Sequence, residues 1–122
     1  MKVPKPTDED RAWFESLVPD APGVTVRPMF GNVAAFVNGN MFLALLGPQV
    51  AVRLDEADRE ELLNQKGAQP FAPMPGRPMK EYVVLPEAWR KQRKKAESWV
   101  ERGLDWTASL PPKQPKKKSG AR

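Results

Sequence analysis

The chain has 122 residues, of which 40% are hydrophobic and 14 are proline, so it can form one domain with a modest core. No run of about 18 apolar residues occurs, which excludes a membrane-spanning helix, and the first ten residues lack the apolar stretch of a secretory signal. Neither cysteine nor histidine is present, which excludes disulfide bonds and thiol or imidazole chemistry and favours a cytoplasmic protein.

The positive charge of the chain is concentrated at its end. The last ten residues carry five of the 20 lysines and arginines and none of the 15 acidic residues, so residues 1–112 are formally neutral although the net charge is +5. We therefore predict a folded domain over residues 1–110 that is not itself basic, followed by a disordered basic tail over residues 111–122.

The first predicted element is a short amphipathic helix that begins after Thr7. The Thr7 hydroxyl can cap this helix, and three acidic residues follow in the first turn, where carboxylates favour the positive end of the helix dipole. Phe14, Leu17 and Val18, with Trp13 beside them, form an apolar stripe at helical spacing. This stripe is predicted to face the core.

The apolar centre of the chain is predicted to form an antiparallel meander that the helices cover. The Asn38-Gly39 pair tolerates the positive φ angles of a tight hairpin, and Gly47-Pro48 marks a second turn. Strands rich in β-branched and apolar residues are predicted on either side of these turns. They cover residues 24–27, 33–36, 41–46 and 50–54.

The second half of the chain is predicted to add two helices and one strand. Asp55 is a capping residue for a helix that reaches Lys66, with Gly67 as its stop signal. A proline-rich loop over residues 68–78 follows, with Phe71 and Met74 as candidate anchors. A strand over residues 79–85 and a helix over residues 86–103 complete an α+β domain, with helices packed on an antiparallel sheet in the order α-β-β-β-β-α-β-α.

Several kinds of catalytic chemistry lack the residues that they need. General acid–base catalysis near neutral pH relies mostly on histidine, and nucleophilic catalysis relies on cysteine or an activated serine. The serines of this chain fall in predicted helices or in the tail, without a strained turn to present them. The glycines fall at predicted turns and form no phosphate-binding loop. We therefore expect a protein that is not an enzyme and carries no cofactor.

Carboxylates are the only ligands left for a metal ion, which would have to be a hard cation. Asp55, Asp58 and Glu61 share one face of the second predicted helix. They lie in its first two turns, where they compensate the helix dipole and face solvent. No metal site is therefore predicted.

The segment Met29-Phe30-Gly31 has two interpretations. It can form a binding lip, in which Gly31 admits a ligand close to the backbone, or a strand corner with Met29 and Phe30 in the core. The second interpretation is favoured, because large apolar side chains are mostly buried.

Basic residues cluster in the last predicted helix and in the tail. Together they could neutralise several phosphate groups and bind nucleic acid in a salt-sensitive, sequence-independent way. The alternative is a solvated helix face with a solubilising tail, and no aromatic residue alternates with the tail lysines to stack on bases. The candidate nucleic-acid contacts are Arg90, Lys91, Arg93, Lys94, Lys95, Lys116, Lys117 and Lys118.

Three of the four tryptophans lie within residues 89–106. Four tryptophans exceed what the core of so small a domain needs, and aromatic residues are enriched at protein interfaces. Trp89, Trp99 and Trp106 are therefore candidate contacts with a protein partner or with a second copy in a homodimer.

Five segments occur in an order that resembles the N-terminal domain of the TfoX/Sxy family. They are PMFG at 28–31, NGNMF at 38–42, VRLDEADREEL at 52–62, KGAQPF at 66–71 and MKEYVVLPE at 79–87, and the resemblance covers residues 8–103. It implies an α+β fold with an antiparallel sheet, similar to type III secretion chaperones and often dimeric, in bacterial proteins associated with the regulation of natural competence. It implies no catalytic residues.

Two features depart from that family pattern. Asn32 stands where family members more often have a second glycine after Met-Phe-Gly. A basic tail stands where the competence regulators continue into a second helical domain, so a competence role is not carried over.

The leading hypothesis is a small bacterial domain that acts by protein contact, through an exposed sheet edge or face or through the last helix. One alternative is weak, non-specific nucleic-acid binding by the basic helix and tail. Another is a small-molecule site between the sheet and the helices.

Overall fold

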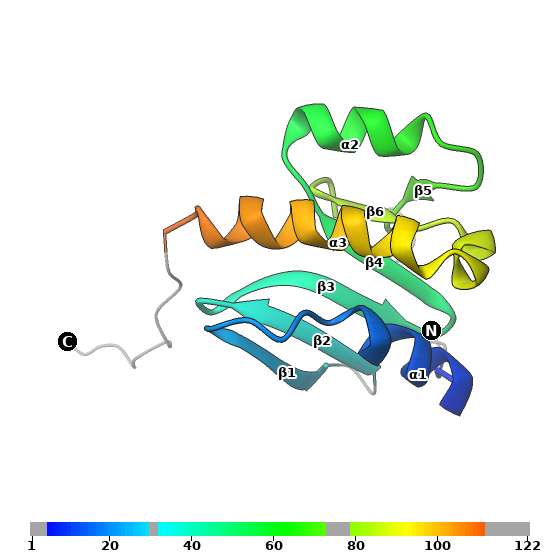
Figure 1. The fold of residues 1–122 in the computed structure, drawn as a ribbon, viewed down its shortest axis with the longest axis horizontal. Helices are drawn as coiled ribbons and strands as arrows, with labels where there is room; N and C mark the ends of the chain where they lie inside the picture. Colours follow the sequence, from blue (N-terminus) through cyan, green and yellow to red (C-terminus); the bar gives the residue numbers. More distant parts are fainter. Residues whose placement is uncertain (1–4, 30–31, 73–78, 112–122) are drawn as a thin grey trace.

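The computed structural model describes residues 5–29, 32–72 and 79–111, which form an open α+β fold (Figure 1). An antiparallel six-stranded sheet has the strand order β1-β2-β3-β4-β6-β5. The strands are β1 Val24–Met29, β2 Asn32–Val37, β3 Asn40–Leu46, β4 Gln49–Arg53, β5 Gln69–Pro70 and β6 Tyr82–Val84. The helices are α1 Asp8–Leu17, α2 Glu56–Leu63, the 3-10 helix η1 Glu87–Lys91, and α3 Arg93–Ala108. The predicted fold class is confirmed.

The turns of the meander lie where the sequence predicts them. Asn38 and Gly39 have φ angles of 53° and 83°, as a tight hairpin between β2 and β3 requires. Gly47 has a φ angle of 57° in the turn between β3 and β4. The pairing of β2 with β3 contains one register shift, between Ala35 and Phe36.

The first helix follows its sequence signals closely. The Thr7 hydroxyl accepts a hydrogen bond from the Asp10 N–H at 3.0 Å, and the Asp10 carboxylate accepts one from the Thr7 N–H at 2.8 Å. This reciprocal capping box fixes the start of α1. Phe14 and Leu17 are buried, which confirms the predicted apolar stripe.

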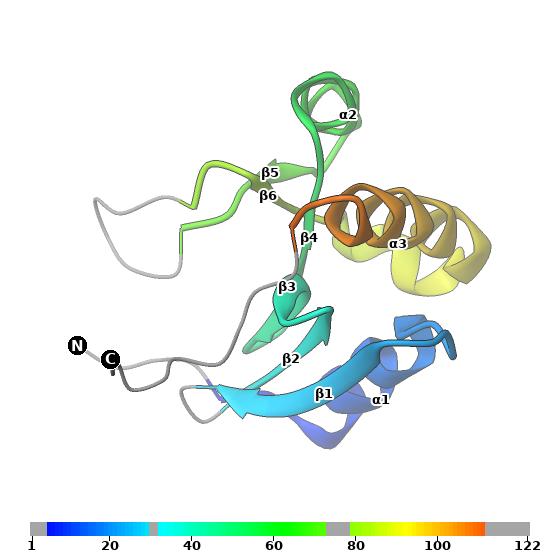
Figure 2. The ribbon, with the colours of Figure 1, turned by 90° about the vertical axis from the view of Figure 1, so that its left-hand side faces the viewer.

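Apolar side chains cover both faces of the sheet. Helices α1 and α3 lie on one face (Figure 2) and enclose the main core, which includes Phe14, Phe42, Val52 and Trp99. The opposite face carries a smaller cluster of Leu46, Ala51, Phe71, Tyr82 and Val84. Phe71 is therefore the anchor that the sequence predicts for its loop, whereas Met74 lies outside the described residues.

The prediction of one continuous helix over residues 86–103 is wrong. Gln92 has φ and ψ angles of −131° and 62°, which separate η1 from α3, and α3 continues to Ala108. Gly103 does not stop the helix. It is buried where α3 crosses β4, and a Cβ atom there would overlap Val52 and the Arg53 carbonyl. Close packing of two backbones, and not helix termination, explains this glycine.

Three smaller differences from the predicted elements concern α2, β5 and β6. Helix α2 ends at Leu63 instead of Lys66, because Asn64 already forms its C-cap. The strand predicted over residues 79–85 is limited to β6, and β5 forms within the loop that was predicted to be irregular. Pairing with β6 explains β5, since no local signal favours a strand there.

Parts of the predictions lie outside the described residues. These parts are Phe30 with Gly31 and the basic tail from residue 112 onward. The two interpretations of the Met29-Phe30-Gly31 segment therefore stay predictions. Among the helices of the described ranges, none has the length and apolar character needed to cross a membrane.

Candidate functional site

The outer edge of β1 pairs with no other strand within the described residues. β1 pairs with β2 and stands at one end of the strand order of the sheet. Thr25, Val26, Arg27 and Pro28 are all exposed, and Val26 is 48% exposed, more than any other large apolar side chain that the structure describes. An edge strand with four consecutive exposed side chains is the geometry that accepts an added strand.

Hydrogen bonding fixes which backbone groups of β1 face outward. The Asn38 N–H donates to the Gly23 carbonyl at 3.4 Å, so these two residues form a hydrogen-bonded pair, and such pairs alternate along the strand. Val24, Val26 and Pro28 therefore direct their backbone groups away from β2. The Val24 N–H is already used in the preceding turn, and proline has none. Val26 consequently offers the free outward N–H among residues 24–28.

The sequence contained one signal for this edge that the prediction did not use. A proline within a strand is confined to positions where no ladder hydrogen bond is needed, which are mostly on edge strands. Pro28 lies inside β1 and faces outward. The β-branched residues of this segment predicted the strand, whereas Pro28 indicated its place at the edge.

Arg90, one of the predicted nucleic-acid contacts, turns toward the protein. Its Nη2 donates to Asp10 Oδ1 at 2.7 Å and to the Pro48 carbonyl at 2.9 Å, so it joins η1 to α1 and to the β3–β4 turn. Burial by itself raises the pKa of Asp10, but hydrogen bonds from the Thr7 N–H and the Arg90 guanidinium outweigh it and hold that pKa below its usual value.

The other basic residues of η1 and α3 face solvent. Arg93 Nε lies 3.3 Å from the Glu97 carboxylate, and Lys95 lies over the Trp89 ring. Lys91 and Lys94 form no ion pair with any residue in the described ranges. Residues 90–95 line a shallow groove of about 710 Å³, which we call the basic groove. The predicted tail contacts Lys116, Lys117 and Lys118 lie beyond the described residues.

Two of the three candidate tryptophans are core residues. Trp89 is 4% exposed and Trp99 is 5% exposed, and the Arg102 guanidinium covers the Trp99 ring at 4.2 Å. Trp106 is partly exposed, and its Nε1 is buried without a hydrogen-bond partner in the described part of the chain. Trp106 is therefore the most exposed of the three candidate tryptophans, and a partner contact through it stays a prediction.

The three carboxylates considered as metal ligands, Asp55, Asp58 and Glu61, have structural partners. Asp55 accepts the Asp58 N–H at 2.8 Å as the N-cap. Arg102 of α3 lies 3.3 Å from both Asp58 Oδ1 and Glu61 Oε1, so the acidic face of α2 ties the two helices together. Within residues 5–29, 32–72 and 79–111, no group of three or more aspartate, glutamate, histidine or cysteine side chains could hold a metal ion.

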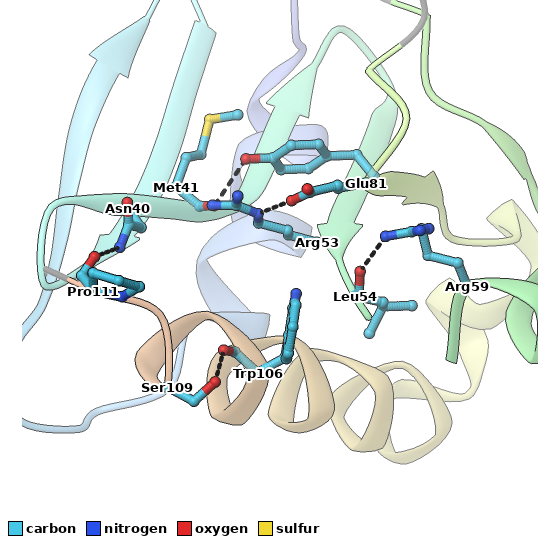
Figure 3. A network of polar contacts seen from close by, with 10 residues as sticks. Asn40, Met41, Arg53, Leu54, Arg59, Glu81, Trp106, Ser109 and Pro111 are labelled. Carbon is cyan, nitrogen blue, oxygen red and sulfur yellow. Dashed lines mark hydrogen bonds and ion pairs between the residues drawn. The ribbon is translucent and has the colours of Figure 1, made fainter. Parts of the chain in front are cut away.

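A polar network joins β3, β4 and the start of β6 (Figure 3). Arg53 Nε donates to Glu81 Oε1 at 2.6 Å, and the Tyr82 hydroxyl donates to the Met41 carbonyl at 2.9 Å. Burial raises the pKa of Tyr82 to about 12, although the charge of Arg53 acts in the opposite direction. Tyr82 therefore stays protonated near neutral pH and holds the network as a hydrogen-bond donor.

Two asparagines stabilise neighbouring loops. Asn32 is buried and its Oδ1 accepts the Gly47 N–H at 2.9 Å, a bond that a glycine at this position could not make. Asn40 Nδ2 donates to the Pro111 carbonyl at 3.0 Å, which ties the end of α3 to β3 (Figure 3). The departure from the family pattern at Asn32 thus has a structural reason.

The open antiparallel sheet, with helices packed on one face, defines an α+β domain whose prominent features are an exposed edge and a basic groove. The chain belongs to the TfoX N-terminal domain family, whose model matches residues 15–106. The resemblance based on five ordered motifs is confirmed. No curated protein matches the chain.

Proposed function

We propose that this TfoX N-terminal domain is a non-enzymatic, cytoplasmic module that binds another protein by adding a strand to the outer edge of β1. The observation that carries this proposal is the free edge itself, with exposed Val26 at its centre. The absence of histidine and cysteine from the whole chain supports binding over catalysis, and the absence of cysteine supports the location.

The outward backbone groups favour a foreign strand over a second copy. An antiparallel strand can donate to the carbonyls of Val24, Val26 and Pro28 and accept the Val26 N–H, which gives four hydrogen bonds. Two copies paired symmetrically about Val26 place Pro28 opposite Val24, and neither of these residues has a free N–H. Only the two bonds between the Val26 residues then form. We therefore expect weak homodimers and tighter binding of a partner strand.

Self-association provides the test, because it needs no unidentified partner. Pro28→Ala restores an outward N–H that can donate to the Val24 carbonyl, so the symmetric ladder gains two hydrogen bonds. At about 1 kcal/mol each, the dimer dissociation constant should fall at least about tenfold. Val26→Lys places like charges opposite each other and should abolish dimers. Light scattering after size exclusion, over a range of concentrations, measures both effects.

Leu63 of α2 provides the matched control, since its side chain is 40% exposed and apolar but lies away from the edge. Leu63→Lys should leave the dimer unchanged. Equal loss of dimers in Leu63→Lys and Val26→Lys, or a Pro28→Ala variant that associates no better than the natural sequence, would contradict binding at β1.

A second candidate function is weak binding of nucleic acid in the basic groove. The observation that favours it is a groove lined wholly by residues 90–95, where Lys91 and Lys94 have ammonium groups without an ion-pair partner in the described part of the chain. Each lysine that neutralises a phosphate releases about one counterion, so binding should weaken steeply as salt rises.

The Lys91→Gln/Lys94→Gln double variant should bind a labelled oligonucleotide more weakly and reduce the salt slope by about 1–2. Fluorescence anisotropy at several salt concentrations measures this slope. Lys5→Gln/Lys80→Gln removes the same charge from exposed positions elsewhere and serves as the control. Removing residues 113–122 should weaken binding further. Binding that is independent of salt, or that falls equally in both double variants, would exclude this function.

A further inference from the structure

A cleft of about 680 Å³ lies between η1, the β3–β4 turn and the loop that follows α2. These three segments meet at the right-hand end of the molecule in Figure 1. The apolar lining includes Val50, Leu85 and Trp89, and Trp13 of α1 also borders the cleft. Its volume lies within the range of small-molecule binding sites.

One hydrogen-bond donor of Arg90, a residue that lines this cleft, lacks an acceptor among the described residues. Arg90 uses Nη2 to bind Asp10 and Pro48, but its Nε is buried and has no hydrogen-bond partner within the described residues. A guanidinium group keeps its charge at any pH at which proteins function, and a buried charged donor without an acceptor costs free energy. A shift of the Arg90 side chain that opens Nε–H to the cleft would let an oxygen atom of a bound ligand accept from it and remove this cost.

The charges around the cleft and the basic groove beside it favour a negative ligand. Its ionisable lining residues are the cations Lys66 and Arg90 and one carboxylate, Glu87. Asp10 is adjacent and offsets the charge of Arg90, and its two oxygens accept hydrogen bonds from Arg90 and Thr7. The basic groove adjoins the cleft through Arg90 and Gln92, which line both, and adds further positive potential.

We propose that this cleft binds a small organic anion. Its carboxylate or phosphate group lies between the Arg90 guanidinium and the Lys66 ammonium and reaches the buried Nε–H after a shift of the Arg90 side chain, and its apolar or aromatic body lies over Val50 and Leu85. The site does not involve β1, so it is independent of the proposed protein contact and either can fail without the other.

Nuclear magnetic resonance of the arginine Nε–H groups tests the site directly. The Arg90 signal is identified by its loss in the Arg90→Lys variant, and the natural protein is titrated with benzoate, phenyl phosphate and neutral benzyl alcohol. Saturable shifts of the Arg90 signal with either anion, and none with benzyl alcohol, support the proposal and show which oxyanion is preferred. No saturable shift with either anion, or equal shifts with the alcohol, would overturn it.

The role of Lys66 is tested by a variant that poses little risk to folding, because Lys66 is exposed. Lys66→Gln should weaken binding of the preferred anion about two- to fivefold, the effect of one exposed charge. Lys80→Gln, at another exposed lysine, should leave the dissociation constant unchanged. Equal affinities for Lys66→Gln and the natural protein would overturn the placement of the anion in this cleft.

Discussion

Replacement of Gly103 by alanine is expected to destabilise the domain by about 3 kcal/mol, although the same change at an exposed helix position stabilises by about 1 kcal/mol. The added Cβ would stand 2.7 Å from the Arg53 carbonyl oxygen and even closer to Val52 Cγ2. The Arg53 oxygen belongs to the backbone of β4 and cannot rotate away. α3 must therefore move off the sheet, which loosens the packing of Trp99 and Val100 against the main core.

Urea denaturation measures this change in the free energy of unfolding. Glu101→Ala provides the control on the same helix, because Glu101 is exposed and should change stability by less than about 0.5 kcal/mol. A Gly103→Ala variant as stable as the natural protein would show that α3 does not cross β4 as closely as the structure indicates.

Removal of the Asp10 carboxylate is expected to cost about 2–3 kcal/mol of stability. Asp10→Ala leaves the Arg90 guanidinium without its carboxylate partner and removes half of the capping box of α1. The Asp10 side chain is 9% exposed and that of Arg90 is 24% exposed, so solvent replaces the lost contact only in part. By contrast, Glu97→Ala breaks the exposed pair with Arg93 and should cost less than about 0.5 kcal/mol.

The same ion pair predicts that the stability of the domain depends on pH in the acidic range. The pKa of Asp10 in the folded protein lies below the ordinary value of 3.8, so the folded state favours the ionised carboxylate. Its contribution is present above about pH 4 and is lost as the pH falls through the lowered pKa. The stability difference between the natural protein and Asp10→Ala should therefore shrink below about pH 4. A difference that stays constant down to pH 2 would mean that Asp10 stabilises the fold without its charge.

Much of the fold could be predicted because its signals are local. Asn38 and Gly39 specify a hairpin by their tolerance of positive φ, and Thr7 and Asp55 cap helices through hydrogen bonds to residues three positions away. The turn signals then divided the apolar centre of the chain into strands of one meander. These features depend only on residues that are close together in the chain, so the sequence is sufficient to predict them.

The candidate sites were harder to predict, because they depend on residues that are distant in the chain. Arg90 belongs by its sequence to a basic run, yet it turns inward to pair with a carboxylate 80 positions earlier, and its Nε is buried without a hydrogen-bond partner in the described part of the chain. Trp89 and Trp99 were candidate interface residues because tryptophans are concentrated in this segment, and the structure places both in the core. Nothing in their local sequence distinguishes the two outcomes.

The sequence by itself determined the α+β class, the hairpins, the helix caps and membership of the TfoX N-terminal family, since all of these follow from short-range patterns and ordered motifs. Only the tertiary structure decided that Gly103 is a contact between α3 and β4, that β1 is a free edge and that η1 borders a cleft. The physical reason is that burial, edge position and charge pairing belong to surfaces that exist only after distant segments have packed together.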